Sequence, residues 1–468
     1  MRVLQSVAPT PEQLRIISKT TAGIEVIRGA AGSGKTTTAI LRLRGLSGIF
    51  LNRRKSTGSK EPVRTLILTF NRTLRGYVQQ LALEQAVVGQ QIELQVDTFA
   101  HWAFELLGNP KMASDNERRI RIKSFGSQIP LDPDFLCDEV DYICGLYLPD
   151  ARQEYLTAKR DGRGVVPRVD KPIREQILRE VIGPYEAWKK KSGFHDWGDL
   201  EVRLAAALHG YPYDIVIVDE TQDFSANQIR ALLKHAAKES AVTFILDAAQ
   251  RIYARGFTWT DVGIKLTQNN SHRLELNYRN TAEIAAFAAP IIEGITTGDV
   301  DATIPNLKGC KRHGSLPVVV VGKFSMQLPY AIEFIKTKVD LSKESVAFLQ
   351  PRGGRYFDAT RDALARAKLN FVEITRNRDW PQGGENIALS TIHSAKGLEF
   401  DHVFLLGLNG EVLPHGAEPG DDGWNKLRRL LAMAVTRART TVILGYKESD
   451  RSDLVDLFKA GTFREIKL

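Results

Sequence analysis

The sequence predicts an α/β protein built on parallel sheets, and three observations support this prediction. An apolar run over 24–27 leads directly into a glycine-rich loop at 29–36, after which a helix is expected to begin. Compact apolar runs alternate with helical patterns along much of the chain, as they do in parallel sheets with crossover helices. Two more apolar runs, over 213–220 and 242–247, end in carboxylates, and open α/β sheets place their chemistry at such strand ends.

The composition indicates a globular and mildly basic protein. Its 468 residues are 43% hydrophobic and 25% charged, and this length predicts roughly two to four domains. Its 64 Lys and Arg residues exceed its 55 Asp and Glu residues, so the net charge of +9 is compatible with a polyanionic partner. No apolar run reaches the roughly 18 residues of a membrane helix, and no signal-peptide core precedes Pro9. We therefore expect a cytoplasmic protein.

The three cysteines, Cys137, Cys144 and Cys310, show neither a C-x-x-C pair nor a metal-ligand spacing with histidines. Two of them lie seven residues apart in a predicted helix, so we interpret them as small buried side chains. The sequence therefore predicts neither a zinc site nor an iron–sulfur cluster.

The loop at 29–36 reads Gly-Ala-Ala-Gly-Ser-Gly-Lys-Thr and matches the phosphate-binding pattern G-x-x-x-x-G-K-[ST] at every fixed position. Its glycines let backbone N–H groups converge on the β- and γ-phosphates, Lys35 adds a positive charge, and Thr36 offers a hydroxyl to Mg²⁺. The sequence therefore predicts a nucleotide site with a magnesium ion. The residues of the loop that we expect to bind the nucleotide are Gly29, Gly32, Ser33, Gly34, Lys35, Thr36 and the adjacent Thr37.

The remaining elements follow in order along the chain. A short helix over 11–17 is expected before the first strand, and the polar, basic stretch 52–62 is expected to be an exposed connection. A strand at 65–70 and a helix at 71–83 come next. Long charged helical patterns between Phe104 and about Trp197 predict a helical insertion, with helices over 117–125, 151–159 and 171–191. A second α/β unit has strands near 318–321, 345–349, 371–374, 387–391, 403–406 and 441–444.

The pair Asp219-Glu220 closes an apolar strand, which is how an NTPase presents one carboxylate to Mg²⁺ and a second to the attacking water. Together with the loop, the pair predicts the two halves of one site, in which Asp219 and Thr36 hold the metal and Glu220 acts as the base. Further blocks of sequence stand in a fixed order around this pair. They are Gln13, Thr69-Phe70-Asn71-Arg72, Asp97-Thr98-Phe99-Ala100-His101, 196–200, 219–223, 247–253, Asn277-Tyr278-Arg279-Asn280, 391–400 and 434–438.

These blocks resemble, in order, the motifs of superfamily 1 DNA helicases of the UvrD/Rep/PcrA type, and the resemblance spans nearly the whole chain. It implies two RecA-like domains with ATP and Mg²⁺ in the cleft between them. The implied limits are 1–103 with 197–272 for the first RecA-like domain, 104–196 for the helical insertion and 273–468 for the second RecA-like domain.

The resemblance also implies roles for single residues. Gln13 and Tyr278 are implied at the adenine, Glu399 at the nucleotide, and Gln250, Arg279 and Arg437 at the γ-phosphate, where Lys35 and Glu220 complete the catalytic set. Each arginine is expected to find its charged partner only when nucleotide is bound. The implied contacts with single-stranded DNA are Phe70, Asn71, Arg72, Thr98, Phe99, His101, Tyr253, Trp259, Thr391 and His393. Aromatic rings among basic residues suit sequence-tolerant stacking on bases.

Two departures from the family pattern stand out. Thr37 occupies a position where many relatives have an arginine. The larger members carry a bulky accessory domain just before the block at 391–400, whereas only 376–384 separates the predicted strands here. Nine residues form a loop and not a domain.

The prediction is a compact ATP-driven helicase or translocase on single-stranded DNA, and the 3′ to 5′ direction is implied by the resemblance alone. Two alternatives stay open. One is a translocase subunit that serves a separate nuclease or a repair or defence protein and unwinds only in a complex. The other is a nucleotide-gated regulatory subunit that binds DNA and hydrolyses ATP without moving. RNA is the least favoured substrate, and the sequence does not indicate a pathway.

Overall fold

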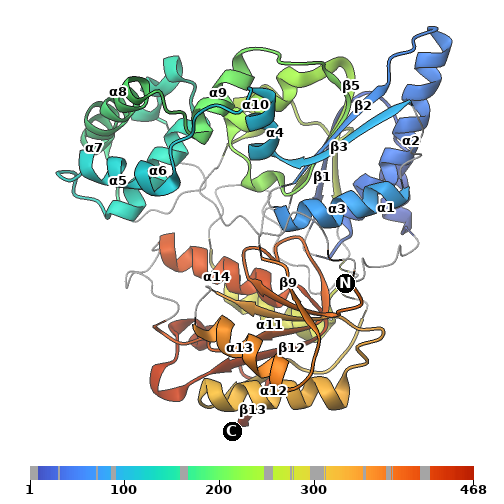
Figure 1. The fold of residues 1–468 in the computed structure, drawn as a ribbon, viewed down its shortest axis with the longest axis vertical. Helices are drawn as coiled ribbons and strands as arrows, with labels where there is room; N and C mark the ends of the chain where they lie inside the picture. Colours follow the sequence, from blue (N-terminus) through green and yellow to red (C-terminus); the bar gives the residue numbers. More distant parts are fainter. Residues whose placement is uncertain are drawn as a thin grey trace.

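The computed structural model has two sheet domains, one above the other in Figure 1, with a helical lobe attached to the side of the upper one. It describes residues 9–29, 32–69, 72–85, 91–158, 167–246, 257–274, 277, 279–295, 310, 312–351, 355–375, 381, 383–411 and 422–468.

The first sheet holds six parallel strands in the described part of the chain, in the order β3-β2-β4-β5-β1-β6. They are β1 (Gly23–Gly29), β2 (Val63–Thr69), β3 (Ile92–Thr98), β4 (Tyr213–Val218), β5 (Ala236–Leu246) and β6 (Ser271–Leu274). Successive residues of a strand face opposite sides, so Ile27 and Ile67 enter one core while Val26 and Leu66 enter another.

Helices cover both faces of this sheet. The core around Ile27 includes residues of α1 (Pro11–Ile17), α2 (Lys35–Ser56) and α3 (Arg72–Gln85). The core around Val26 includes residues of α4 (Phe99–Leu106), α9 (Trp197–Ala206) and α10 (Ala226–His235). The fold thus delivers the phosphate-binding loop and the carboxylates after β4 to the same edge of one sheet.

The helical lobe has its own core, formed around Ile122, Leu136 and Ile177. Its elements are α5 (Asp115–Phe125), α6 (Pro133–Leu146), the 3₁₀ segment η1 (Pro149–Leu156), α7 (Lys171–Gln176), the π-helical segment η2 (Ile177–Ile182) and α8 (Gly183–Ser192). Lys189 pairs with both Asp196 and Asp199 at the junction with α9, at 3.0 and 2.6 Å. This ion-pair cluster joins the lobe to the first sheet domain.

The second sheet holds seven parallel strands among the described residues, in the order β13-β7-β12-β11-β8-β10-β9. They are β7 (Val318–Val321), β8 (Val346–Gln350), β9 (Phe371–Glu373), β10 (Ile387–Thr391), β11 (Phe400–Leu405), β12 (Ala438–Tyr446) and β13 (Arg464–Lys467). Its helices are α11 (Ala282–Ile292), α12 (Phe324–Lys338), α13 (Arg355–Arg366) and α14 (Asp422–Val435).

Most predicted elements are present, and the differences have local causes. The stretch 52–62 is not wholly a connection, because α2 continues to Ser56 with basic residues in its last turn, where positive charge is favourable. The helix expected over 151–159 is the 3₁₀ segment η1. Strands β3, β6 and β13 were not predicted. Two predicted domain limits fall inside secondary-structure elements. The limit between residues 103 and 104 lies in α4, and the limit between residues 272 and 273 lies in β6. The exact residues at which the domains begin and end stay a prediction.

The two sheet domains share one apolar cluster. Leu74 and Val78 of α3 belong to the same cluster of buried side chains as Ile392 and Leu398 of the second domain. Helix α3 lies along the side of the first domain that faces the second (Figure 1). The two domains are therefore in direct contact where α3 packs on the second domain.

Candidate functional site

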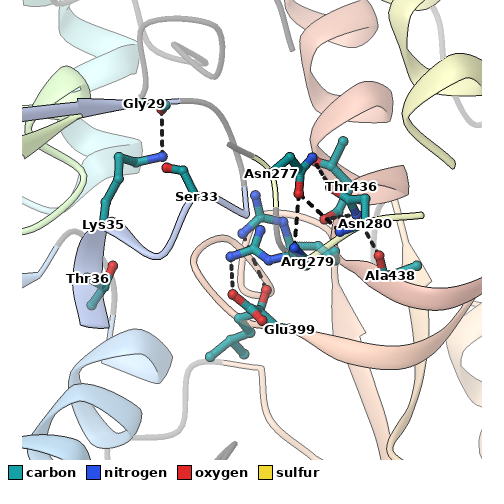
Figure 2. A network of polar contacts seen from close by, with 12 residues as sticks. Gly29, Ser33, Lys35, Thr36, Asn277, Arg279, Asn280, Glu399, Thr436 and Ala438 are labelled. Atoms are coloured by element: carbon teal, nitrogen blue, oxygen red, sulfur yellow. Dashed lines mark hydrogen bonds and ion pairs between the residues drawn. The ribbon is translucent and has the colours of Figure 1, made fainter. Parts of the chain in front are cut away.

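The glycine-rich loop joins β1 to α2, as its sequence predicts. Gly34 is the N-cap of α2, with a left-handed φ of 76°, and Lys35 is the first helical residue. Lys35 Nζ donates a hydrogen bond of 2.7 Å to the carbonyl of Gly29 across the loop (Figure 2). Gln13 of α1 donates from Nε2 to the carbonyl of Ser33 at 3.1 Å. Helix α1 is thereby fastened to the loop.

Two oxygen ligands that suit a divalent cation lie side by side next to the loop. Thr36 Oγ1 donates a 2.9 Å hydrogen bond to Asp219 Oδ2, and Asp219 is 2% exposed at the end of β4. Burial, together with the negative charge of Glu220, raises the pKa of Asp219 to about 7. Hydroxyl and carboxylate oxygens are ligands that Mg²⁺ prefers, so these donors fit the predicted magnesium site.

Glu220 is held in an uncommon backbone conformation, with a φ of 54°. Non-glycine residues rarely adopt this left-handed region, and such strain concentrates at functional sites. Gln222 donates a side-chain hydrogen bond to the Glu220 carboxylate. Burial alone would raise the pKa of Glu220, but the positive charges of Lys396, Arg437 and Lys35 outweigh burial and lower it. Glu220 is therefore an ionised carboxylate, as a general base must be.

A pocket lies between the two sheet domains at these residues. Its described lining is Gly32, Gly34, Lys35, Thr36, Thr37, Tyr77, Leu81 and Glu220 from the first domain and Arg279, Gly397, Glu399 and Arg437 from the second. The sequence had assigned all of these residues to the site except Tyr77, Leu81 and Gly397. Both domains therefore contribute to one site.

Arg279 and Arg437 reach the pocket from the second domain, and both already have partners there. Arg279 pairs with Glu399 opposite the loop (Figure 2). Arg437 is 2% exposed and donates from Nε to the carbonyl of Met433 at 3.1 Å and from Nη1 to that of Leu398 at 3.3 Å. The expectation that only a bound nucleotide supplies a charged partner for Arg279 is wrong, because Glu399 of the same domain supplies a carboxylate.

Two asparagines of the block 277–280 fix the arginines in place. Asn280 Nδ2 donates to the carbonyls of Thr436 and Ala438, at 3.0 and 2.6 Å, on either side of Arg437 (Figure 2). Asn277 Nδ2 donates to Asn280 Oδ1 at 3.0 Å. The sequence placed both asparagines in a motif without assigning them a role. The backbone partners of Asn280 lie more than 150 residues away along the chain.

Lys396 is a further residue whose role the sequence did not reveal. It is 1% exposed and forms ion pairs with Asp223 and, at 3.5 Å, with Glu220 of the first domain. A buried lysine needs a charged partner. These ion pairs therefore hold the two domains together at Glu220, the predicted base. The only sign of this role in the sequence was that Lys396 lies within the block 391–400.

Gly397 allows the close packing of the two domains. Its φ of +82° is left-handed, and a Cβ at this position would lie 2.7 Å from the terminal carbons of Leu74 on α3. On the other side of the pocket, a Cβ on Gly32 would lie 2.5 Å from the Cβ of Arg279. Because neither glycine has a side chain, the backbone of one domain can approach the other domain more closely at these two positions.

We expect Gly397→Ala to cost more stability than Gly461→Ala. Gly461 has a similar φ of +84°, but a Cβ there would have nothing within 4 Å. Both alanines carry the left-handed backbone cost of about 1–2 kcal/mol, and only Gly397→Ala adds overpacking against Leu74, which costs roughly 1–3 kcal/mol more. Thermal unfolding of the two variants measures the difference. Equal losses would show that the Leu74 contact is not limiting.

The predicted DNA contacts that the structure describes fall into two groups, and the first group lies at the sheet edges. Thr98 and Thr391 end β3 and β10, at the carboxyl edges of the two sheets. Thr98 caps α4, and His101 Nδ1 lies 2.7 Å from Asp97 Oδ2. His393 follows β10 and is half-buried. These positions are compatible with a strand of DNA crossing both sheet edges.

The two predicted aromatic contacts that the structure describes, Phe99 and Trp259, both pack against other rings of the first domain. Phe99 is 6% exposed, and its ring centroid lies 5.4 Å from that of Trp102 and 6.3 Å from that of Phe224. A base stacks on an accessible ring face, so this placement does not support stacking by Phe99. Trp259 is half-buried and packs against Phe244, with ring centroids 5.3 Å apart. The pattern of aromatic residues next to basic ones in the sequence did not distinguish a buried ring from an exposed ring.

Several predicted residues lie outside the described part of the chain, and the exposed ring of Trp197 was given no role. Trp197 is 48% exposed at the start of α9, between the helical lobe and the first sheet. The predicted residues Phe70, Asn71, Gln250, Tyr253 and Tyr278 and the side chain of Arg72 lie outside the described residues.

In the part of the chain that the structure describes, no helix is long and apolar enough to span a membrane.

Two family models match the sequence. The UvrD/REP helicase N-terminal domain matches residues 10–270, which is more than half of the chain. The UvrD-like helicase C-terminal domain matches residues 355–449. The matches together include the loop, both carboxylates after β4 and Arg437.

Several individual proteins are similar to this chain. The ATP-dependent DNA helicase UvrD2 of Mycobacterium tuberculosis strain H37Rv is 24% identical in an alignment 409 positions long that covers 63% of this chain and 57% of that protein. The ATP-dependent DNA helicase Rep of Buchnera aphidicola subsp. Schizaphis graminum is 37% identical over 86 residues, which is 18% of this chain and 12% of that protein. The chain thus spans little more than half the length of UvrD2.

A solved structure, the C-terminal domain of a possible DNA helicase from Lactobacillus plantarum WCFS1, aligns with 40% of this chain and 98% of its own. The identity is 20% and the TM-score is 0.30. This similarity is too low to bear on fold or function.

Proposed function

Since the chain belongs to the UvrD/Rep helicase family, we propose that it hydrolyses ATP in the cleft between its sheet domains and uses hydrolysis to move along single-stranded DNA. The observation that carries this proposal is the pocket shared by the phosphate-binding loop and two arginines of the other domain. A site built in this way senses the γ-phosphate and the closure of the cleft together.

In the proposed reaction the loop residues from Gly29 to Thr37 hold the phosphates, with Lys35 neutralising their charge. Glu220 orients and deprotonates the attacking water, and Arg279 and Arg437 stabilise charge as the γ-phosphate leaves. Gln250 is proposed to sense that phosphate. Gln13, Tyr278 and Glu399 are proposed to bind the remainder of the nucleotide. Thr36 and Asp219 would hold Mg²⁺, which neutralises phosphate charge when bound.

The raised pKa of Asp219 predicts a magnesium requirement that grows as pH falls. Below about pH 7 the carboxyl carries a proton that the cation must displace, whereas above it the carboxylate is free. After correction for Mg²⁺ bound to ATP itself, the half-saturating Mg²⁺ concentration should be about tenfold higher at pH 6 than at pH 8. Equal concentrations at both pH values would contradict the assignment of Asp219.

Single-stranded DNA is proposed to cross the carboxyl edges of the two sheets. Thr98 and His101 would contact it from the first domain, and Thr391 and His393 from the second. Phe70, Asn71, Arg72, Tyr253 and Trp259 keep their proposed roles from the family resemblance, whereas the buried ring of Phe99 does not support one. The contacts would be to phosphates and base faces, so binding should be salt-sensitive and nearly independent of sequence.

A specific observation favours translocation over independent unwinding. Strands β9 and β10 are neighbours in the sheet, and only residues 374–386 connect them. The proposed motor is therefore expected to unwind long duplexes poorly by itself. Its proposed direction, 3′ to 5′, rests on the family resemblance alone. A partner, such as a separate nuclease or a repair or defence protein, would supply the remaining activity.

The experiment that tests the proposed function measures ATPase activity with single-stranded DNA, duplex DNA and RNA, alongside displacement of a strand from duplexes with 3′ or 5′ tails. We expect the strongest stimulation by single-stranded DNA and weak displacement confined to 3′-tailed duplexes. Lack of stimulation by any nucleic acid would contradict a DNA motor. Processive unwinding of long duplex by the protein alone would contradict the need for a partner.

A further inference from the structure

Helix α3 turns one face toward the cleft, and this face belongs to no motif in the sequence. Leu74, Tyr77 and Leu81 recur at a spacing of three and four residues, which places them on one side of a helix. Leu74 is fully buried and packs against Gly397 of the second domain. Tyr77 and Leu81 continue that side and line the nucleotide pocket.

The rest of the pocket is suited to phosphates. Glycines of the loop and the positive charges of Lys35, Arg279 and Arg437 line it from both domains. These groups neutralise and hydrogen-bond oxyanions. Of the two carboxylates in the described lining, Glu220 is the proposed base and Glu399 is engaged in its ion pair with Arg279. Tyr77 is the only aromatic residue among the described residues of the lining, and Leu81 is the only large aliphatic one.

A ribose needs what these two residues provide. Its hydroxyls donate and accept hydrogen bonds, and a phenol O–H can do either with them. Its carbon face is apolar and can pack against a leucine side chain. Gln13, which is fastened to the loop through Ser33, lies on a different helix and is proposed to bind the base.

We propose that α3 recognises the sugar of the bound nucleotide, with the Tyr77 hydroxyl bonded to a ribose hydroxyl and Leu81 packed against the ring. This inference rests on the proposed function, since it concerns the nucleotide of the same site. It makes Tyr77 a specificity-determining residue that favours ATP over the deoxy analogue that lacks the bonded hydroxyl. Thr37, which stands where many relatives have an arginine, lines the same pocket.

The test compares the wild-type protein with Tyr77→Phe, using ATP, 2′-deoxy-ATP and 3′-deoxy-ATP in the presence of saturating single-stranded DNA. Tyr330→Phe is the matched control, because Tyr330 is a half-buried tyrosine on α12 that does not line the pocket. One hydrogen bond corresponds to a change of about fivefold in affinity.

We expect Tyr77→Phe to raise the KM for ATP about fivefold and to leave the KM for one of the two deoxy analogues unchanged, because that analogue already lacks the bond. The change should appear in KM rather than in kcat. Affinity for a non-hydrolysable ATP analogue, measured by calorimetry, should fall by the same factor. Tyr330→Phe should behave as the wild-type protein does for all three nucleotides.

The inference is overturned if Tyr77→Phe changes the KM for no nucleotide, or if it raises the KM for all three nucleotides equally. A melting temperature equal to that of the wild-type protein shows that the variant is folded. Failure of the proposed function looks different, because the wild-type protein itself would then show no ATPase activity stimulated by DNA.

Discussion

An Arg437→Ala variant is expected to lose DNA-stimulated ATP hydrolysis by a factor on the order of 10³ to 10⁵, which is the contribution of arginine fingers in other NTPases. Arg437 lines the nucleotide pocket from the second domain and is held there by two backbone carbonyls. Its planar guanidinium can meet the leaving γ-phosphate with two parallel hydrogen bonds. Loss of that group removes both the charge and the geometry.

The same prediction applies to Arg279, with one additional consequence. Arg279 forms an ion pair with Glu399, and its positive charge outweighs the burial that would raise the pKa of that carboxyl. Arg279→Ala therefore removes the finger and also leaves Glu399 without its partner. We expect some loss of stability in this variant alone, and Arg437→Ala is the cleaner test of catalysis.

Steady-state ATPase assays with single-stranded DNA measure the effect, and two further variants control it. Arg437→Lys should remain strongly impaired, because a point charge cannot reproduce the planar fork. Arg439→Ala is the matched control, since Arg439 lies two residues away on β12, outside the pocket lining, and pairs with Asp401 at 3.6 Å. If Arg437→Ala kept most of its activity with a normal melting temperature, Arg437 would not be a finger.

A Glu220→Gln variant is expected to bind ATP and to hydrolyse it about 10² to 10⁴ times more slowly, the range for loss of a general base. Asp219 and Thr36 keep their positions in this variant, so binding of Mg²⁺ and nucleotide should persist. Lys35→Ala should do the reverse and weaken nucleotide binding, because it removes the cation of the loop.

Single-turnover hydrolysis and binding of a fluorescent nucleotide analogue separate these two variants. Glu239→Gln is a suitable control, because Glu239 lies on β5 with an 83% exposed side chain. Hydrolysis by Glu220→Gln at a rate near that of the wild-type protein would show that another group activates water.

Local sequence was enough to predict the fold wherever one segment carries the whole signal. The phosphate-binding loop, the strand before Asp219 and the strands of the second sheet other than β13 are examples. Alternation of strands and helices determines the sheet type, and apolar strands must be buried whatever their partners. Strand β3, with Glu93 and Gln95 among its residues, lacks such a compact apolar run and was missed.

The remainder of the site depends on contacts between distant segments. Lys396 meets Asp223, and Asn280 meets the backbone around Arg437, only after two domains are folded and packed. Tyr77 reaches the pocket through the placement of α3, which its own sequence does not determine. Phe99 shows the opposite error, because an aromatic residue next to a strand end has the same sequence pattern whether it is buried or exposed.

The central claim is that ATP hydrolysis in this cleft moves the protein along single-stranded DNA. Stopped-flow fluorescence with DNA of increasing length, labelled at its 5′ end, measures this movement directly. With excess DNA and a protein trap, we predict an ATP-dependent signal whose delay increases in proportion to DNA length and is absent in Glu220→Gln. A delay that does not depend on length, while ATP is hydrolysed at the DNA-stimulated rate, would contradict translocation.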